Sequence, residues 1–146
     1  MMVHLLDPDP RMRCRMVHFL TRQGIAVSEA GELSASERVC AELPPTAVIV
    51  DPTEDPVGTV LKLREIAPGA PILVWTAPTS SALEETFRWL GCGFITKPAL
   101  SSEVAFELGR LAAACSGLTV RPGPASPGLP PAMRPAGRRG ARSRTA

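Results

Sequence analysis

The sequence contains no tyrosine, and aromatic residues make up only 4% of it. A folded core must therefore be built from aliphatic side chains, and 45% hydrophobic residues in a chain of 146 are enough for one globular domain. No apolar run approaches the roughly 18 residues that a membrane-spanning helix needs, and the amino-terminal residues lack a signal-peptide layout. These absences predict a cytoplasmic protein without a membrane partner.

Cysteine motifs are also missing. The cysteines form no C-x-x-C pair and no zinc spacing with His4 or His18. We therefore expect reduced thiols that are buried as small apolar side chains, rather than a metal or redox site. The four positions are Cys14, Cys40, Cys92 and Cys115.

Charge divides the chain into two parts. Residues 1–116 carry all 14 acidic and 10 of the 16 basic residues, whereas residues 117–146 carry six arginines and no acid. The second part is rich in proline, glycine and alanine, so we expect a folded domain at 1–116 and a disordered basic tail at 117–146. Such a tail could attract nucleic acid or an acidic surface. A tail without a specific partner is favoured, because no aromatic residues alternate with the arginines for base stacking.

Within residues 1–116, short apolar runs alternate with amphipathic segments, as is typical of an α/β protein with a parallel sheet. The third and fourth apolar runs are nearly uninterrupted, which predicts central strands. Asp9 is expected to cap the first helix, and Ser80 and Ser101 the last two. We predict strands at 2–6, 25–29, 46–50, 71–75 and 93–96, and helices at 10–23, 33–42, 57–67, 80–90 and 101–115.

Polar residues stand where the apolar runs end: Asp7, Asp51, Thr76 and Lys97. The carboxyl ends of parallel strands meet at one edge of a sheet, where ligands bind. A carboxylate there can accept a phosphoryl group if cations compensate the negative charges and a hydroxyl binds a phosphoryl oxygen. Each residue alone could be a turn former, a strand end or a solvated charge, but their joint order favours a phosphoryl site.

This ordered set resembles the receiver domain of two-component response regulators. The resemblance covers about residues 2–115 and rests on four segments: Leu5-Leu6-Asp7, Val48-Ile49-Val50-Asp51, Trp75-Thr76-Ala77 and Thr96-Lys97-Pro98. It implies a flavodoxin-like, doubly wound sheet of five parallel strands flanked by five helices. It also implies a signalling module rather than an enzyme.

The resemblance assigns a role to each matching residue. Asp51 corresponds to the phosphoacceptor, Thr76 to the switch hydroxyl, Lys97 to the lysine that contacts the phosphoryl group, and Phe94 to the aromatic switch. Phosphorylation would draw Thr76 and Phe94 inward. The implied partners are a sensor histidine kinase or phosphotransfer protein, and a downstream protein bound by the face of the fourth helix, fifth strand and fifth helix. A homodimer through this face is open.

The resemblance further implies Mg²⁺, held by Asp7, Asp51 and the backbone carbonyl of Thr53, with Asp9 as a further candidate. The sequence departs from the family here, because Pro8 stands where a second acidic residue is usual.

Three functions remain open. The first is a stand-alone receiver phosphorylated on Asp51, since no output domain is recognisable after residue 116. The second is a non-phosphorylated, atypical receiver that acts as a constitutive interaction module. The third, a flavodoxin-like nucleotide- or phosphate-binding enzyme, is disfavoured because Asp7-Pro8-Asp9-Pro10 replaces the Gly-rich loop that it needs.

Overall fold

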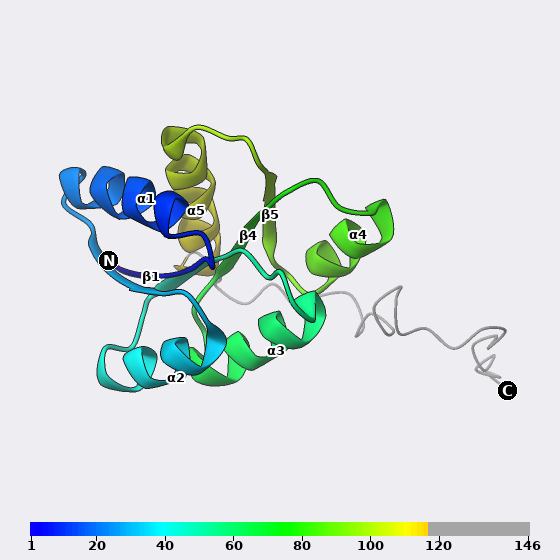
Figure 1. The fold of residues 1–146 in the computed structure, drawn as a ribbon, viewed down its shortest axis with the longest axis horizontal. Helices are drawn as coiled ribbons and strands as arrows, with labels where there is room; N and C mark the ends of the chain where they lie inside the picture. Colours follow the sequence, from blue (N-terminus) through cyan, green and yellow to red (C-terminus); the bar gives the residue numbers. More distant parts are fainter. Residues whose placement is uncertain (117–146) are drawn as a thin grey trace, which may run out of the picture.

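The structure, a computed structural model, describes residues 1–116, which form a five-stranded parallel sheet with helices on both faces (Figure 1). The strand order is β2-β1-β3-β4-β5, so β3 is central and β4 is interior. This order confirms the predicted doubly wound, flavodoxin-like fold. The predicted tail, residues 117–146, lies outside the described residues. The strands are β1 (Met2–Leu6), β2 (Ala26–Ala30), β3 (Ala47–Val50), β4 (Ile72–Thr76) and β5 (Gly93–Thr96).

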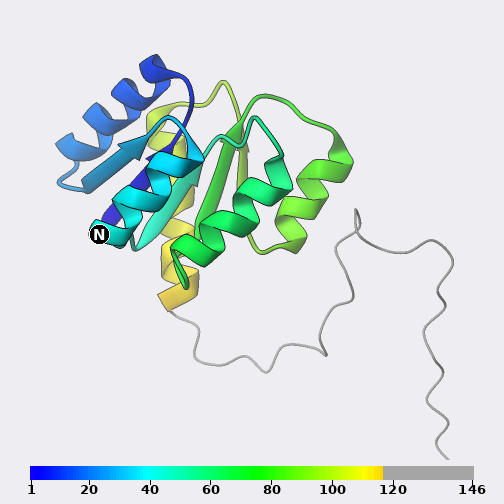
Figure 2. The same ribbon diagram turned by 60° about the horizontal axis from the view of Figure 1, so that its bottom comes forward.

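The five helices cover the sheet in two layers. Helices α1 and α5 lie on one face, and α2, α3 and α4 lie on the other (Figures 1 and 2). Alternate residues of each strand point into opposite layers, so every interior strand is buried on both sides. No helix among the described residues is long and apolar enough to cross a membrane. The helices are α1 (Pro10–Arg22), α2 (Leu33–Glu42), α3 (Pro56–Ile66), α4 (Ser81–Trp89) and α5 (Ser101–Ser116).

The helix caps follow the sequence in two of three cases. The Asp9 carboxylate accepts a hydrogen bond from the Arg11 N–H at the start of α1, and Ser80 caps α4. The expected Ser101 cap is wrong, because Ser101 is itself the first residue inside α5. The Glu103 carboxylate instead accepts a hydrogen bond from the Leu100 N–H, at 2.6 Å.

The cysteine prediction is correct in one respect and wrong in another. All four thiols are free, and Cys40 and Cys92 are buried. Cys14 and Cys115, however, are exposed, because they lie on the outward faces of α1 and α5. An amphipathic helix places one side of its surface in solvent, and a cysteine on that side is not buried.

One polar group lies deep in the core. His4, in the middle of β1, is fully buried, and its two ring nitrogens lie 2.8 Å from the hydroxyls of Ser28 in β2 and Ser36 in α2. A neutral imidazole satisfies both contacts, since one nitrogen donates and the other accepts. Burial disfavours the charged form and lowers the pKa of His4 to about 4.

This burial predicts acid destabilisation. In the unfolded chain His4 takes up a proton near pH 6.5, whereas the folded chain resists protonation until about pH 4. The free energy of unfolding should therefore decrease as the pH falls through this window, by about 3 kcal/mol in total from this residue. Urea unfolding at several pH values should show a steeper loss for the wild type than for His4→Val. Titration of the His4 imidazole near pH 6.5 in the folded chain, measured by NMR, would contradict the prediction.

Candidate functional site

Sheet hydrogen bonds continue past the strand ends and place the polar residues. The Asp51 N–H donates to the Leu6 carbonyl at 2.8 Å, and the Lys97 N–H donates to the Thr76 carbonyl at 2.7 Å. The Asp7 N–H donates to the Ala30 carbonyl at 3.2 Å. These bonds fix the backbone of Asp7 beside β2, of Asp51 beside β1 and of Lys97 beside β4, at the edge of the sheet where the sequence predicted them.

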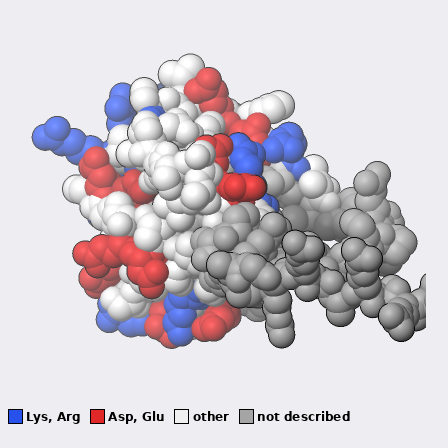
Figure 3. Space-filling view, turned by 90° about the vertical axis from the view of Figure 1, so that its right-hand side faces the viewer, with Lys and Arg blue, Asp and Glu red and all other residues white. Residues whose placement is uncertain are grey.

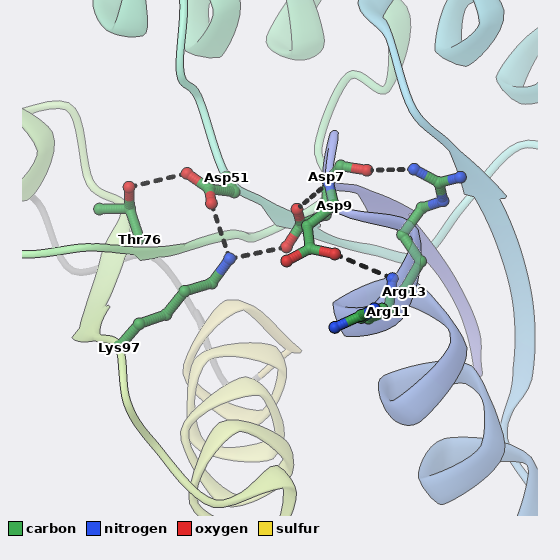
Figure 4. Close-up of polar contacts among 7 residues, drawn as sticks. All are labelled: Asp7, Asp9, Arg11, Arg13, Asp51, Thr76 and Lys97. Atoms are coloured by element: carbon green, nitrogen blue, oxygen red, sulfur yellow. Dashed lines mark hydrogen bonds and ion pairs between the residues drawn. The ribbon is translucent and has the colours of Figure 1, made fainter.

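Lys97 joins the two acidic strand ends. Its ammonium donates to Asp7 Oδ2 at 2.8 Å and to Asp51 Oδ2 at 2.6 Å (Figure 4). The exposed side-chain fractions are 15% for Lys97, 0% for Asp7 and 11% for Asp51. Burial alone lowers the pKa of Lys97, but hydrogen bonds and charge from Asp51 and Asp7 outweigh it, so that the pKa lies above its usual value. Lys97 is therefore a fixed positive charge between two carboxylates.

The hydroxyl of Thr76 contacts the other oxygen of Asp51. Thr76 Oγ1 donates to Asp51 Oδ1 at 2.7 Å, across the gap between β4 and β3 (Figure 4). The family resemblance implied that phosphorylation would draw Thr76 inward, yet the hydroxyl already points to the acceptor in the unmodified chain. Both Asp51 oxygens are thus engaged by donors from neighbouring strand ends.

Phe94 lies apart from this cluster. The half-buried ring stacks on Phe87 of α4, with 6.0 Å between ring centroids, and the Arg88 guanidinium lies 6.0 Å from its centre. The structure therefore places Phe94 between β5 and α4, in contact with the core. Its assignment as an aromatic switch stays a prediction.

Two further residues contact the site. Arg13 of α1 donates to the backbone carbonyl of Asp7 at 2.6 Å, and so fixes the turn after β1. The Lys97 ammonium also lies 4.7 Å from the ring centre of Trp75, a cation–π distance. The Trp75 ring is buried and so also belongs to the core. Neither contact has a sequence signal, since each depends on how helix or strand ends meet.

The carboxylates that a magnesium ion would need are occupied by other partners in this structure. Mg²⁺ prefers six oxygen ligands in octahedral geometry, usually one or two carboxylates with waters. Asp7 and Asp51 already bind Lys97, and one carboxylate oxygen of Asp9 accepts the hydrogen bond that caps α1. Thr53, whose backbone carbonyl the resemblance implied as a ligand, lies in the β3–α3 loop and lines the same pocket as Asp51. Among residues 1–116 no group of three His, Cys, Asp or Glu side chains could hold a metal ion.

A pocket of about 450 Å³ opens beside Asp51. Its shape depends on the β3–α3 loop, where Asp55 adopts a left-handed backbone (φ 41°) and caps α3. A Cβ on Gly58 would overlap the Asp55 carboxylate, so any other residue there would displace the Asp55 side chain from its capping position. The lining includes Leu6, Pro8, Glu32, Asp51, Pro52, Thr53, Glu54, Asp55 and Gly58.

The sequence matches no protein-family model and no curated protein. Several solved structures with the same fold are response regulators or their receiver domains. The chemotaxis protein CheY4 of Vibrio cholerae is 19% identical with a TM-score of 0.65, over 75% of this chain and 97% of that one. A response regulator receiver protein of Sinorhizobium medicae is 19% identical with a TM-score of 0.65, over 78% of this chain and 95% of that one. A LuxR-family response regulator of an Aurantimonas species is 25% identical, TM-score 0.68, over 77% and 85%. The chain thus has the receiver fold.

The buried lysine bridge predicts a large effect of its removal. Lys97→Met leaves Asp7 and Asp51 facing each other without a positive charge, and should lower the free energy of unfolding by about 2–4 kcal/mol. Lys97→Met combined with Asp7→Asn should recover part of this loss, because one of the two facing charges is gone. Lys62→Met is the matched control, since this exposed lysine pairs only with the exposed Glu65 and its loss should cost under about 1 kcal/mol. Equal losses for both lysine variants in urea unfolding would reject the bridge.

Proposed function

We propose that this chain is a single-domain response-regulator receiver that accepts a phosphoryl group on Asp51 and signals through protein–protein interaction. The observation that carries the proposal is the contact of Asp51 with the Lys97 ammonium and the Thr76 hydroxyl, at a pocket open to a phosphodonor. The receiver fold supports it. The phosphodonor partner in this proposal is a sensor histidine kinase or phosphotransfer protein. The chain itself acts as a signalling module and not as an enzyme.

The chemistry of this step is nucleophilic attack. A carboxylate oxygen of Asp51 forms a bond to phosphorus while the bond from phosphorus to the donor's imidazole nitrogen breaks, and the imidazole leaves. The product is an acyl phosphate whose phosphoryl group carries a charge of about −1.5 to −2, in place of the single negative charge of the free carboxylate. Lys97 compensates part of this charge, and the Thr76 hydroxyl can rotate from Asp51 to donate to a phosphoryl oxygen.

The face of α4, β5 and α5 is the proposed output surface. Strand β5 is the edge of the sheet, and a pocket of about 480 Å³ lies between it and α5. Phe106 and Leu100 are 71% and 68% exposed, the largest exposed fractions among the large apolar side chains of residues 1–116. Seen from the side of α4, charged groups of both signs surround an uncharged centre (Figure 3). A downstream protein, or a second copy of the chain, can bind such a surface.

A second function is favoured by one observation. Thr76 already contacts Asp51, and Lys97 already compensates the charge of the acceptor, in the unmodified chain. A receiver that holds this arrangement without phosphorylation can serve as a constitutive interaction module. In that case the carboxylate of Asp51 is a structural partner of Lys97 and Thr76.

Phosphorylation can be tested directly. Incubation with acetyl phosphate should add the mass of one phosphoryl group to the wild-type chain, measured by intact-mass spectrometry. Asp51→Ala should gain nothing. Glu54→Gln removes another carboxylate that lines the same pocket and should be labelled like the wild type. Absence of an adduct on the wild type, or equal labelling of Asp51→Ala, contradicts the proposal.

The constitutive alternative makes the opposite prediction in cells. If it holds, Asp51→Ala should support the cellular function of the wild type in a strain that lacks the chromosomal copy, whereas Phe106→Ser should not. Leu61→Ser is the matched control, because it also replaces an exposed apolar side chain with serine. Leu61 is 40% exposed on α3, away from the proposed face. Complete loss of function with an Asp51→Ala variant that circular dichroism shows to be folded excludes the constitutive module.

A further inference from the structure

The positive charge of Lys97 occupies the carboxylate oxygens that a cation would need. Its ammonium binds Oδ2 of both Asp7 and Asp51, at 2.8 and 2.6 Å. An ion held by the two carboxylates would use the same oxygens, because they are the ones that face each other across the strand ends. Binding of such an ion must therefore displace the ammonium from at least one carboxylate.

The two remaining oxygens also have donors. Asp7 Oδ1 accepts from the Asp9 N–H at 2.8 Å, and Asp51 Oδ1 accepts from the Thr76 hydroxyl at 2.7 Å. All four carboxylate oxygens are thus hydrogen-bonded within the protein. A buried polar group that is already satisfied gains less from a new ligand, because an existing bond must be broken first.

No third acidic side chain supplements the pair. Pro8 follows Asp7 directly and lines the same pocket as Asp51, but its side chain has no oxygen. Asp9 is exposed and caps α1, and Glu54 is exposed. With Lys97 in place, the three buried groups sum to a charge of −1, which attracts a divalent ion less than two unpaired carboxylates.

We propose that the Lys97 ammonium is the resident countercharge of this site in place of a divalent cation, and that an ion binds only if Lys97 is removed or a carboxylate is added at position 8. In the unmodified protein, Lys97 then neutralises part of the negative charge of Asp7 and Asp51. The proposal concerns the unmodified chain and holds or fails independently of whether Asp51 is phosphorylated.

Magnesium titration of the full-length protein tests this. Trp75 lies beside Lys97 and reports the site by fluorescence, and Trp89→Phe as a background removes the other tryptophan. In this background we expect no saturable change with millimolar Mg²⁺. Pro8→Asp should bind Mg²⁺ at least about tenfold more tightly, because ligand charge count sets affinity. Isothermal titration calorimetry provides a second readout.

Matched variants separate the effect of a carboxylate at position 8 from the effects of added charge elsewhere and of losing the proline. Pro10→Asp adds the same charge at a nearby exposed position and should not bind Mg²⁺. Pro8→Ala removes the proline without adding a ligand and should not bind Mg²⁺ either. Lys97→Met should gain Mg²⁺ affinity, whereas Lys62→Met, which alters the only other lysine of the chain, should not. Saturable Mg²⁺ binding by the parent that Asp51→Asn abolishes would overturn the proposal. So would the failure of both Pro8→Asp and Lys97→Met to bind more tightly than the parent.

Discussion

Two carboxylates that are buried at one edge of a parallel sheet require a positive charge between them, and Lys97 provides it. Asp7 has no exposed side-chain surface, and Asp51 has little. Without the ammonium, both negative charges would lie close together in a region of low dielectric constant, where repulsion is strong. The ion pair therefore fixes how the ends of β1, β3 and β5 meet. It also sets which oxygens are available to a ligand.

The rest of the fold positions this ion pair. Sheet hydrogen bonds extend one residue beyond β1, β3 and β5 and so align the backbones of the three charged residues. Aliphatic layers on both faces of the sheet bury these strand ends. This burial strengthens the electrostatic attraction between the lysine and the two carboxylates. Arg13 fixes the turn after β1, and Trp75 lies beneath the ammonium of Lys97. The site is thus a property of the whole sheet edge rather than of one loop.

The elements and the polar strand ends were predictable from the sequence, since both follow from local patterns. Apolar runs of four or five residues gave every strand to within one residue, and Asp9 and Ser80 were recognisable as caps. Burial on helices was harder to predict. Cys14 and Cys115 are exposed because the orientation of each helix on the sheet, and not the residue type, decides which side faces solvent.

The sequence by itself determined the fold class, the order of the elements and the gathering of Asp7, Asp51, Thr76 and Lys97 at one edge, because period and spacing encode them. Only the tertiary structure decided which partners these groups choose. Lys97 could have pointed to solvent, and Thr76 away from Asp51, without any change in the pattern. Side-chain geometry across strands that are distant in sequence sets those contacts, and they make the site a lysine-bridged carboxylate pair.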